Sequence, residues 1–172
     1  MGRQINFNIG IIGCGLIGQK RSKSLGKKGK LIACADIDIN KAKKVATNKK
    51  IKIFSDWKKL IKIKKIDIII ISTFHNKLST ILLEAYKRKK HIIVEKPAAK
   101  NFYEIKKVIS KIRNNKVKIR VGYNHRYHPS VILSKKLIKS GSIGKLMYIR
   151  ARYGHGGRLN YEQEWRAKKF IS

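Results

Sequence analysis

The sequence predicts an α/β fold built around a parallel sheet. Short runs rich in β-branched residues alternate with segments whose apolar residues recur at helical spacing. Parallel strands need a long crossover connection, usually a helix, so this alternation indicates repeated strand–helix–strand units. One run, from Ile68 to Ile71, is apolar at every position, which is typical of a strand covered by helices on both faces.

The predicted elements follow one another along the chain. The β-branched runs predict six strands, at residues 7–12, 31–35, 51–54, 66–71, 91–94 and 117–123. The patterns between them predict helices at residues 16–28, 41–48, 56–61, 78–86 and 105–112. Six strands in this alternation complete a doubly wound sheet of the Rossmann type, which we assign to residues 1–123.

The remaining residues, 124–172, follow a different pattern. A helix is expected over residues 129–139, ending before Gly141, and a strand over residues 145–153. A segment of about 50 residues with one helix and one strand is too short to bury a core of its own. We therefore expect this segment to be the beginning of a truncated α+β second domain.

The composition is strongly basic, with 43 Lys and Arg against nine Asp and Glu and a formal net charge of +34. Such a charge can mark a nucleic-acid-binding protein. Here the lysines are spread over nearly every predicted helix and turn, and neither an aromatic stacking surface nor a recognition helix is evident. Nucleic-acid binding is therefore the least favoured functional hypothesis.

Membrane insertion and metal binding are also not expected. No apolar run is long enough to span a bilayer, and no signal-peptide pattern opens the chain, which favours a cytoplasmic protein. Cys14 and Cys34 form no ligand motif and are expected to be buried, reduced thiols. His125 and His128 lack a third ligand, so the sequence predicts no metal site.

A glycine-rich loop predicts the binding site. Residues 13–18 read Gly-Cys-Gly-Leu-Ile-Gly, directly after a predicted strand and at the start of a predicted helix. Gly13 permits the tight turn, Gly15 lets a pyrophosphate approach the backbone, and Gly18 allows close packing of helix and strand. The intervening Leu16 and Ile17 belong to the same phosphate-binding turn, at the positive end of the helix dipole. This loop therefore predicts a bound dinucleotide.

Asp36 indicates which dinucleotide is preferred. It lies 18 residues beyond Gly18, at the tip of the second predicted strand. A carboxylate there can accept hydrogen bonds from the adenosine ribose hydroxyls and repels a 2′-phosphate. NAD is therefore the expected cofactor, and NADP stays possible because nearby lysines can compensate.

A charged segment, Glu95-Lys96-Pro97, follows the fifth predicted strand on the same edge of the sheet. In a functional interpretation Lys96 lies near the nicotinamide, where it donates a hydrogen bond to a substrate hydroxyl or helps its proton to leave. In the alternative interpretation it is one more surface lysine. Position alone does not decide between them.

The motifs taken together resemble the Gfo/Idh/MocA oxidoreductases. The glycine loop, Asp36, Ser72-Thr73, Glu95-Lys96-Pro97, the segment from Gly122 to Pro129 and the segment from Ser142 to Leu146 occur in that family's order. The resemblance implies oxidation or reduction, with NAD or NADP, of a hydroxyl-bearing carbon in a sugar, cyclitol or nucleotide sugar. It also implies that Lys96 is catalytic and that Thr73, Glu95 and Asn124 lie around the nicotinamide and its ribose.

The chain departs from the family pattern in two places. After Thr73 the family commonly has Pro-Asn-x-x-His, whereas residues 74–78 read Phe-His-Asn-Lys-Leu, which leaves Asn76, with His75, as the candidate cofactor contact. The family's D-x-G-x-H segment does not occur in the 172 residues. We therefore expect an amino-terminal fragment that is inactive alone, with homo-oligomers only for the full-length protein. A non-catalytic NAD(H)-binding module is the alternative.

Arg126 is a further candidate near the expected cleft. Its guanidinium can hold a carboxylate or phosphate of the substrate, or it can tie the two domains together. A small sugar-like molecule is the expected partner in either case.

Overall fold

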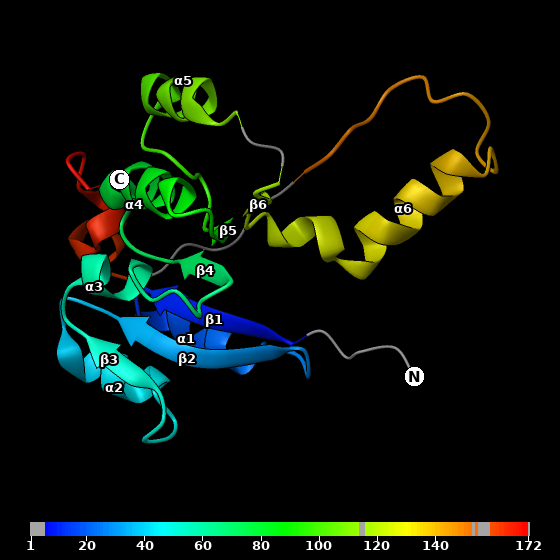
Figure 1. The fold of residues 1–172 in the computed structure, drawn as a ribbon. Coiled ribbons are helices and arrows are strands. Elements are labelled where there is room, and N and C mark those ends of the chain that lie inside the picture. Colours follow the sequence, from blue (N-terminus) through cyan, green and yellow to red (C-terminus); the bar gives the residue numbers. More distant parts are fainter. Residues whose placement is uncertain (1–5, 114–115, 153, 155–158, 172) are drawn as a thin grey trace, which may run out of the picture.

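A computed structural model describes residues 6–113, 116–152, 154 and 159–171. Its centre is a six-stranded, all-parallel sheet in the order β3-β2-β1-β4-β5-β6 (Figure 1). The strands are β1 (Phe7–Ile12), β2 (Gly29–Ala35), β3 (Lys52–Phe54), β4 (Ile68–Ile71), β5 (His91–Val94) and β6 (Ile119–Val121). This is the predicted doubly wound Rossmann sheet, and its strand order reverses between β1 and β4.

Helices connect the strands and continue beyond them. They are α1 (Leu16–Lys23), α2 (Ile39–Val45), α3 (Trp57–Ile61), α4 (His75–Lys87), α5 (Phe102–Lys111) and α6 (Pro129–Lys139). Three 3₁₀ turns follow β6 in the chain: η1 (Asn124–Tyr127), η2 (Tyr161–Gln163) and η3 (Trp165–Ala167). The helix α1 ends at Lys23, five residues earlier than predicted, because the chain turns at Gly26 to begin β2 at Gly29.

Side chains of the strands alternate between two hydrophobic cores. In β4, Ile69 and Ile71 pack with Leu78 of α4 on one face of the sheet. Ile70 packs with Val45 of α2 on the other face. Because both faces are covered, every residue of this strand is apolar, as the sequence indicated.

The segment after β6 leaves the sheet and later returns to it. The helix α6 projects away from the sheet and has no buried residue (Figure 1). The predicted strand at 145–153 is wrong for residues 145–152, which are exposed and have no regular secondary structure, while residue 153 lies outside the described residues. A strand needs a hydrogen-bonding neighbour, and no described strand pairs with these residues. Residues 161–171 then lie beside α4.

Candidate functional site

A cleft of about 400 Å³ opens at the carboxyl edge of the sheet, where the strand order reverses. This is the place at which open parallel sheets bind their ligands, because the two halves of the sheet diverge there. Its walls come from the ends of β1, β2 and β4 and from the segment after α6. Residues that line the cleft include Gly13, Gly15, Asp36, Trp57, Ser72, Thr73, Asn76 and Trp165.

The glycine loop is packed too tightly for side chains at two of its glycines. Gly13 has a φ of +89°, and a Cβ there would lie 2.5 Å from the backbone carbonyl of Ser72. A Cβ on Gly18 would lie 2.0 Å from the carbonyl oxygen of Gly13. The Ser72 hydroxyl donates to that same oxygen at 2.7 Å. The loop is therefore held against the end of β4 by contacts that only glycine permits.

Gly15 has the opposite surroundings. A Cβ placed on it would meet no heavy atom within 4 Å, and the residue lines the cleft. It is also the N-cap of α1, and no side chain caps that end of the helix. The open space and the uncapped helix terminus suit an anionic group such as a pyrophosphate.

Asp36 joins the tip of β2 to the glycine loop. Its carboxylate accepts the Cys14 N–H at 2.6 Å and the Asp38 N–H at 2.9 Å, using one oxygen for each. Its own N–H donates to the Phe54 carbonyl of β3 at 3.1 Å. Because each carboxylate oxygen can accept more than one hydrogen bond, Asp36 can also receive ribose hydroxyls from the cleft. The backbone contacts fix its orientation.

The far wall of the cleft is built by the returning segment. The Asn76 backbone N–H donates to the Ile171 carbonyl at 3.1 Å, and its side-chain amide donates to the Phe170 carbonyl at 3.3 Å. Trp165 packs with its ring centroid 5.0 Å from that of Phe74. Among the described residues, Oδ1 of Asn76 is buried and has no hydrogen-bond partner.

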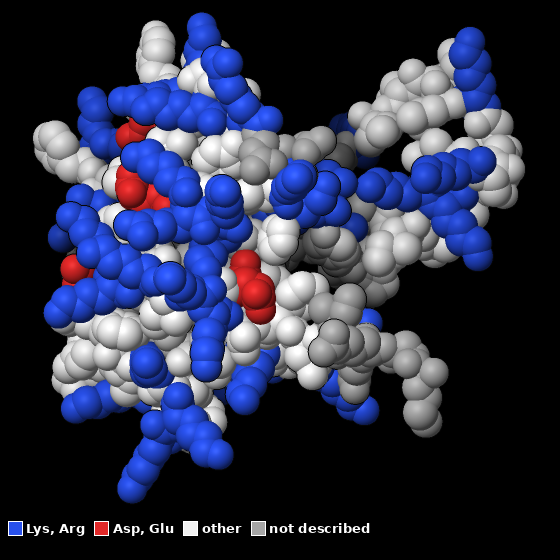
Figure 2. Space-filling view, viewed as in Figure 1, with Lys and Arg blue, Asp and Glu red and all other residues white. Residues whose placement is uncertain are grey.

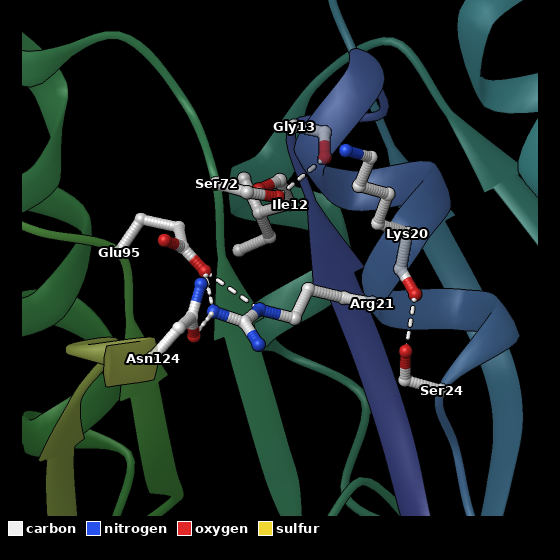
Figure 3. Close-up of polar contacts among 8 residues, drawn as sticks. All are labelled: Ile12, Gly13, Lys20, Arg21, Ser24, Ser72, Glu95 and Asn124. Atoms are coloured by element: carbon white, nitrogen blue, oxygen red, sulfur yellow. Dashed lines mark hydrogen bonds and ion pairs between the residues drawn. The ribbon is translucent and has the colours of Figure 1, made fainter. Parts of the chain in front are cut away.

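A second group of polar residues lies beside the cleft (Figure 3). Glu95, directly after β5, is paired with Arg21 of α1, which also donates to Asn124 of η1 at 2.8 Å. Lys96 is exposed in a tight turn, which the Ala98 N–H closes onto the Glu95 carbonyl at 3.0 Å. The Lys96–Pro97 peptide bond within this turn is cis. Glu95 and Asn124 are thus brought together by a residue that the sequence did not single out.

The structure divides the predicted site residues into two sets. Those that line the cleft are Gly13, Gly15, Leu16, Ile17, Asp36, Thr73 and Asn76. Those that do not line it, all within the described part of the chain, are Gly18, Glu95, Lys96, Asn124 and Arg126. Gly18 packs behind the loop, and Lys96 and Arg126 are exposed.

Several residues of this region carried no assigned role in the sequence, although Ser72 belongs to the Ser72-Thr73 motif. Trp57 and Ser72 line the cleft, and Arg21 contacts Glu95 and Asn124. Ser72 directly follows the end of β4, and Trp57 directly follows Asp56, the N-cap of α3. Both positions could be recognised from the sequence. Arg21 offered no such signal, because it is one of 43 Lys and Arg.

The described part of the chain also holds two cysteines and a strongly basic surface (Figure 2). Cys14 and Cys34 are buried, free thiols; the hydrogen bond between them and their burial raise the pKa of Cys14 far above its usual range. In the described residues no three His, Cys, Asp or Glu side chains gather as a metal site, and no helix is long and apolar enough to cross a membrane. Figure 2 shows Lys and Arg spread over the visible face rather than gathered in one stripe.

The fold and the cleft together define a dinucleotide-binding Rossmann protein. A sequence model of the Gfo/Idh/MocA family, described as an oxidoreductase family with an NAD-binding Rossmann fold, matches residues 7–123. The chain belongs to this family.

Named relatives share the same region. Levoglucosan dehydrogenase of Pseudarthrobacter phenanthrenivorans is 32% identical over 120 residues, which are 69% of this chain and 31% of that protein. Inositol 2-dehydrogenase of Rubrobacter xylanophilus is 26% identical over 146 residues, covering 83% and 42% of the two chains. A structure of levoglucosan dehydrogenase with NADH superposes with a TM-score of 0.82 at 26% identity, covering 97% of this chain and 48% of that one. The chain spans less than half the length of these relatives.

Proposed function

We propose that this chain is the cofactor-binding part of an NAD-dependent oxidoreductase that interconverts a hydroxyl-bearing carbon and a carbonyl. The glycine loop and Asp36, which open onto one cleft, carry the proposal. Relatives named for levoglucosan and inositol support a sugar or cyclitol as the substrate class. A nucleotide-linked sugar is a further candidate substrate, because a dehydrogenase solved in complex with NADH and UDP-GlcNAcA has a similar fold.

The residues of the cleft suit each part of NAD. Gly15 leaves room for the pyrophosphate at the uncapped end of α1. Asp36 accepts the adenosine ribose hydroxyls, and its charge disfavours a 2′-phosphate. Lys41 also lines the cleft, and its positive charge can pair with the 2′-phosphate of NADP. Thr73 and Asn76 follow β4 in the chain, at the end of the sheet toward which the nicotinamide half would extend.

Lys96 is the proposed proton-transfer residue. It follows β5 at the same edge of the sheet as the cleft and is exposed to a substrate approaching from solvent. Bound NAD supplies the hydride acceptor, and the ammonium group of Lys96 donates to the substrate oxygen or takes part in moving its proton. Arg126 is the proposed contact for an anionic substituent of the substrate. Residues 1–172 contain no D-x-G-x-H, so we propose that they bind NAD(H) without turnover by themselves.

The location and assembly follow from the same interpretation. Two buried free cysteines support a reducing compartment, and we propose the cytoplasm. The family resemblance supports a homo-oligomer of the full-length protein.

The test of the cofactor site is energy transfer to NADH. Both tryptophans of the chain, Trp57 and Trp165, line the cleft, and NADH absorbs where tryptophan emits. Titration with NADH should quench their emission. Asp36→Ala should raise the Kd about tenfold, because it removes charge-assisted hydrogen bonds to the ribose.

The matched control is Asp67→Ala. Asp67 accepts the Asn8 N–H at 2.7 Å and thus anchors backbone as Asp36 does, but it precedes β4 at the opposite edge of the sheet. This variant should bind NADH like the unaltered chain. Failure of the unaltered chain to bind NADH would refute the cofactor site.

A further inference from the structure

Arg21 connects three parts of the Rossmann domain that are distant in sequence. Its Nε donates to Oε1 of Glu95 at 2.6 Å, and its Nη2 contacts the same oxygen. The same Nη2 donates to Oδ1 of Asn124 at 2.8 Å. These partners lie 74 and 103 residues further along the chain. One guanidinium therefore joins α1 to the turn after β5 and to η1 after β6 (Figure 3).

Gly122 lies close against the guanidinium of Arg21 and the carboxylate of Glu95. A Cβ on Gly122 would lie 3.0 Å from Nη2 of Arg21 and 3.0 Å from Oε1 of Glu95. The Gly122 N–H donates to the Val94 carbonyl at 2.8 Å, which holds the ends of β5 and β6 together. The ion pair is thus packed on one side against the ends of β5 and β6.

The pair also stands out because acids are scarce in this chain. Nine Asp and Glu serve 43 Lys and Arg. The other two ion pairs found among the described residues, Asp38 with Lys41 and Glu84 with Lys87, join residues three apart on helices and are more exposed. The side chains of Arg21 and Glu95 are only 25% and 12% exposed. A partly buried ion pair in which two nitrogens of the guanidinium contact the carboxylate holds its two side chains in place better than an exposed pair does.

We propose that Arg21 is a positioning residue that fixes the ends of β5 and β6, where the nicotinamide half of NAD would extend beyond the cleft, relative to the glycine loop. It acts through Glu95 and Asn124 and thereby sets the turn that carries Lys96. This inference rests on the proposed cofactor site. No residue of this group lies at the β2 end, where Asp36 would hold the adenosine ribose.

The position in the sheet makes the effect selective. The adenosine half of NAD would lie over β1 and β2, and the nicotinamide half over β4 and β5, because the strand order reverses between β1 and β4. Arg21 holds the ends of β5 and β6. Its loss should therefore disturb the nicotinamide half and leave the adenosine half intact.

The experiment compares two ligands by calorimetric titration of the full 172-residue chain. NADH occupies both halves of the cleft, whereas ADP occupies only the adenosine and diphosphate half. Arg21→Met deletes the donors and keeps most of the aliphatic stem. It should raise the Kd of NADH about tenfold, as expected for lost charge-assisted hydrogen bonds, and change the Kd of ADP by less than about twofold. Arg21→Lys should recover part of the NADH affinity.

The control and the double variant separate positioning from general stability. Lys23→Met removes an exposed cation from the same helix and should change neither Kd. If Arg21 acts through Glu95, adding Arg21→Met to Glu95→Gln should weaken NADH by no more than about a further twofold. Thermal melting of each variant establishes that it is folded, and Arg21→Lys and Glu95→Gln decide the matter if Arg21→Met does not fold.

Four outcomes would overturn the proposal. Equal weakening of NADH and ADP would make Arg21 a general support of the domain, and unchanged NADH affinity would remove its role altogether. Binding of ADP but not NADH by the unaltered chain would leave no nicotinamide subsite for Arg21 to position. Binding of neither ligand would refute the cofactor site, and this inference with it.

Discussion

Gly15→Ala should separate cofactor binding from folding. The added Cβ meets no heavy atom within 4 Å, and the backbone at Gly15, with φ −66° and ψ −167°, is open to any residue. Alanine gains about 0.4–1 kcal/mol from the unfolded state, and it is a poorer N-cap than glycine by a similar amount, so stability should change by less than about 0.5 kcal/mol. The methyl group would nevertheless fill the space assigned to the pyrophosphate. The Kd of NADH should rise at least about tenfold, which is about 1.4 kcal/mol.

Gly13→Ala should behave differently. Its positive φ costs about 1–2 kcal/mol for alanine, and the 2.5 Å approach to Ser72 adds about 1–3 kcal/mol of overpacking. A loss of about 2–5 kcal/mol is a large share of the stability of an ordinary domain. Gly18→Ala, with a Cβ 2.0 Å from the Gly13 carbonyl, should be destabilised as well.

Urea unfolding without ligand and tryptophan-to-NADH energy transfer measure the two effects separately. Gly26→Ala is the control for Gly15→Ala, because its Cβ also meets open space but the residue does not line the cleft. It should match the unaltered chain in both measurements. A Gly15→Ala chain that binds NADH normally would show that the pyrophosphate does not lie against this residue.

Three further outcomes are expected. Lys90 donates to the carbonyls of Ile63, Lys64 and Ile66, so Lys90→Met should lower the free energy of unfolding by about 2–3 kcal/mol in urea titrations; a change under about 0.5 kcal/mol would contradict this role. Asn101 caps α5 by accepting the N–H of Glu104 at 3.0 Å, so Asn101→Ala should cost about 1 kcal/mol, a loss that Asn101→Asp should largely avoid. Cys14 and Cys34 should not react with a thiol reagent near neutral pH until the protein is unfolded, because both side chains are fully buried; prompt labelling of the native chain would disprove it.

Much of the fold was predictable because its signals are local. The β-branched runs identified all six strands of the sheet, and the clearest was β4, which is covered on both faces and apolar throughout. The glycine spacing identified the cleft because only glycine tolerates the φ of Gly13 and the contact at Gly18. Asp36 lies at the predicted strand tip and in the cleft. These features are specified by residues within a few positions of one another.

The wrong strand prediction and the missed contacts depend on residues that are far apart in the sequence. The pattern at residues 145–152 favoured a strand, but a strand forms only with a neighbour, and the described residues supply none. The contacts of Asn76 with Phe170 and Ile171 span more than ninety residues and depend on where the returning segment packs. No local pattern encodes such a contact.

The sequence alone therefore determined the Rossmann sheet, the glycine loop and the acidic residue at the tip of β2. The tertiary structure decided which cation binds Glu95 and which residues close the cleft. Arg21 looks like any of the 43 Lys and Arg until the sheet order brings the end of β5 and the turn after β6 beside α1. The physical reason is that a salt bridge is chosen by proximity and burial, and both are fixed only when the strands have assembled.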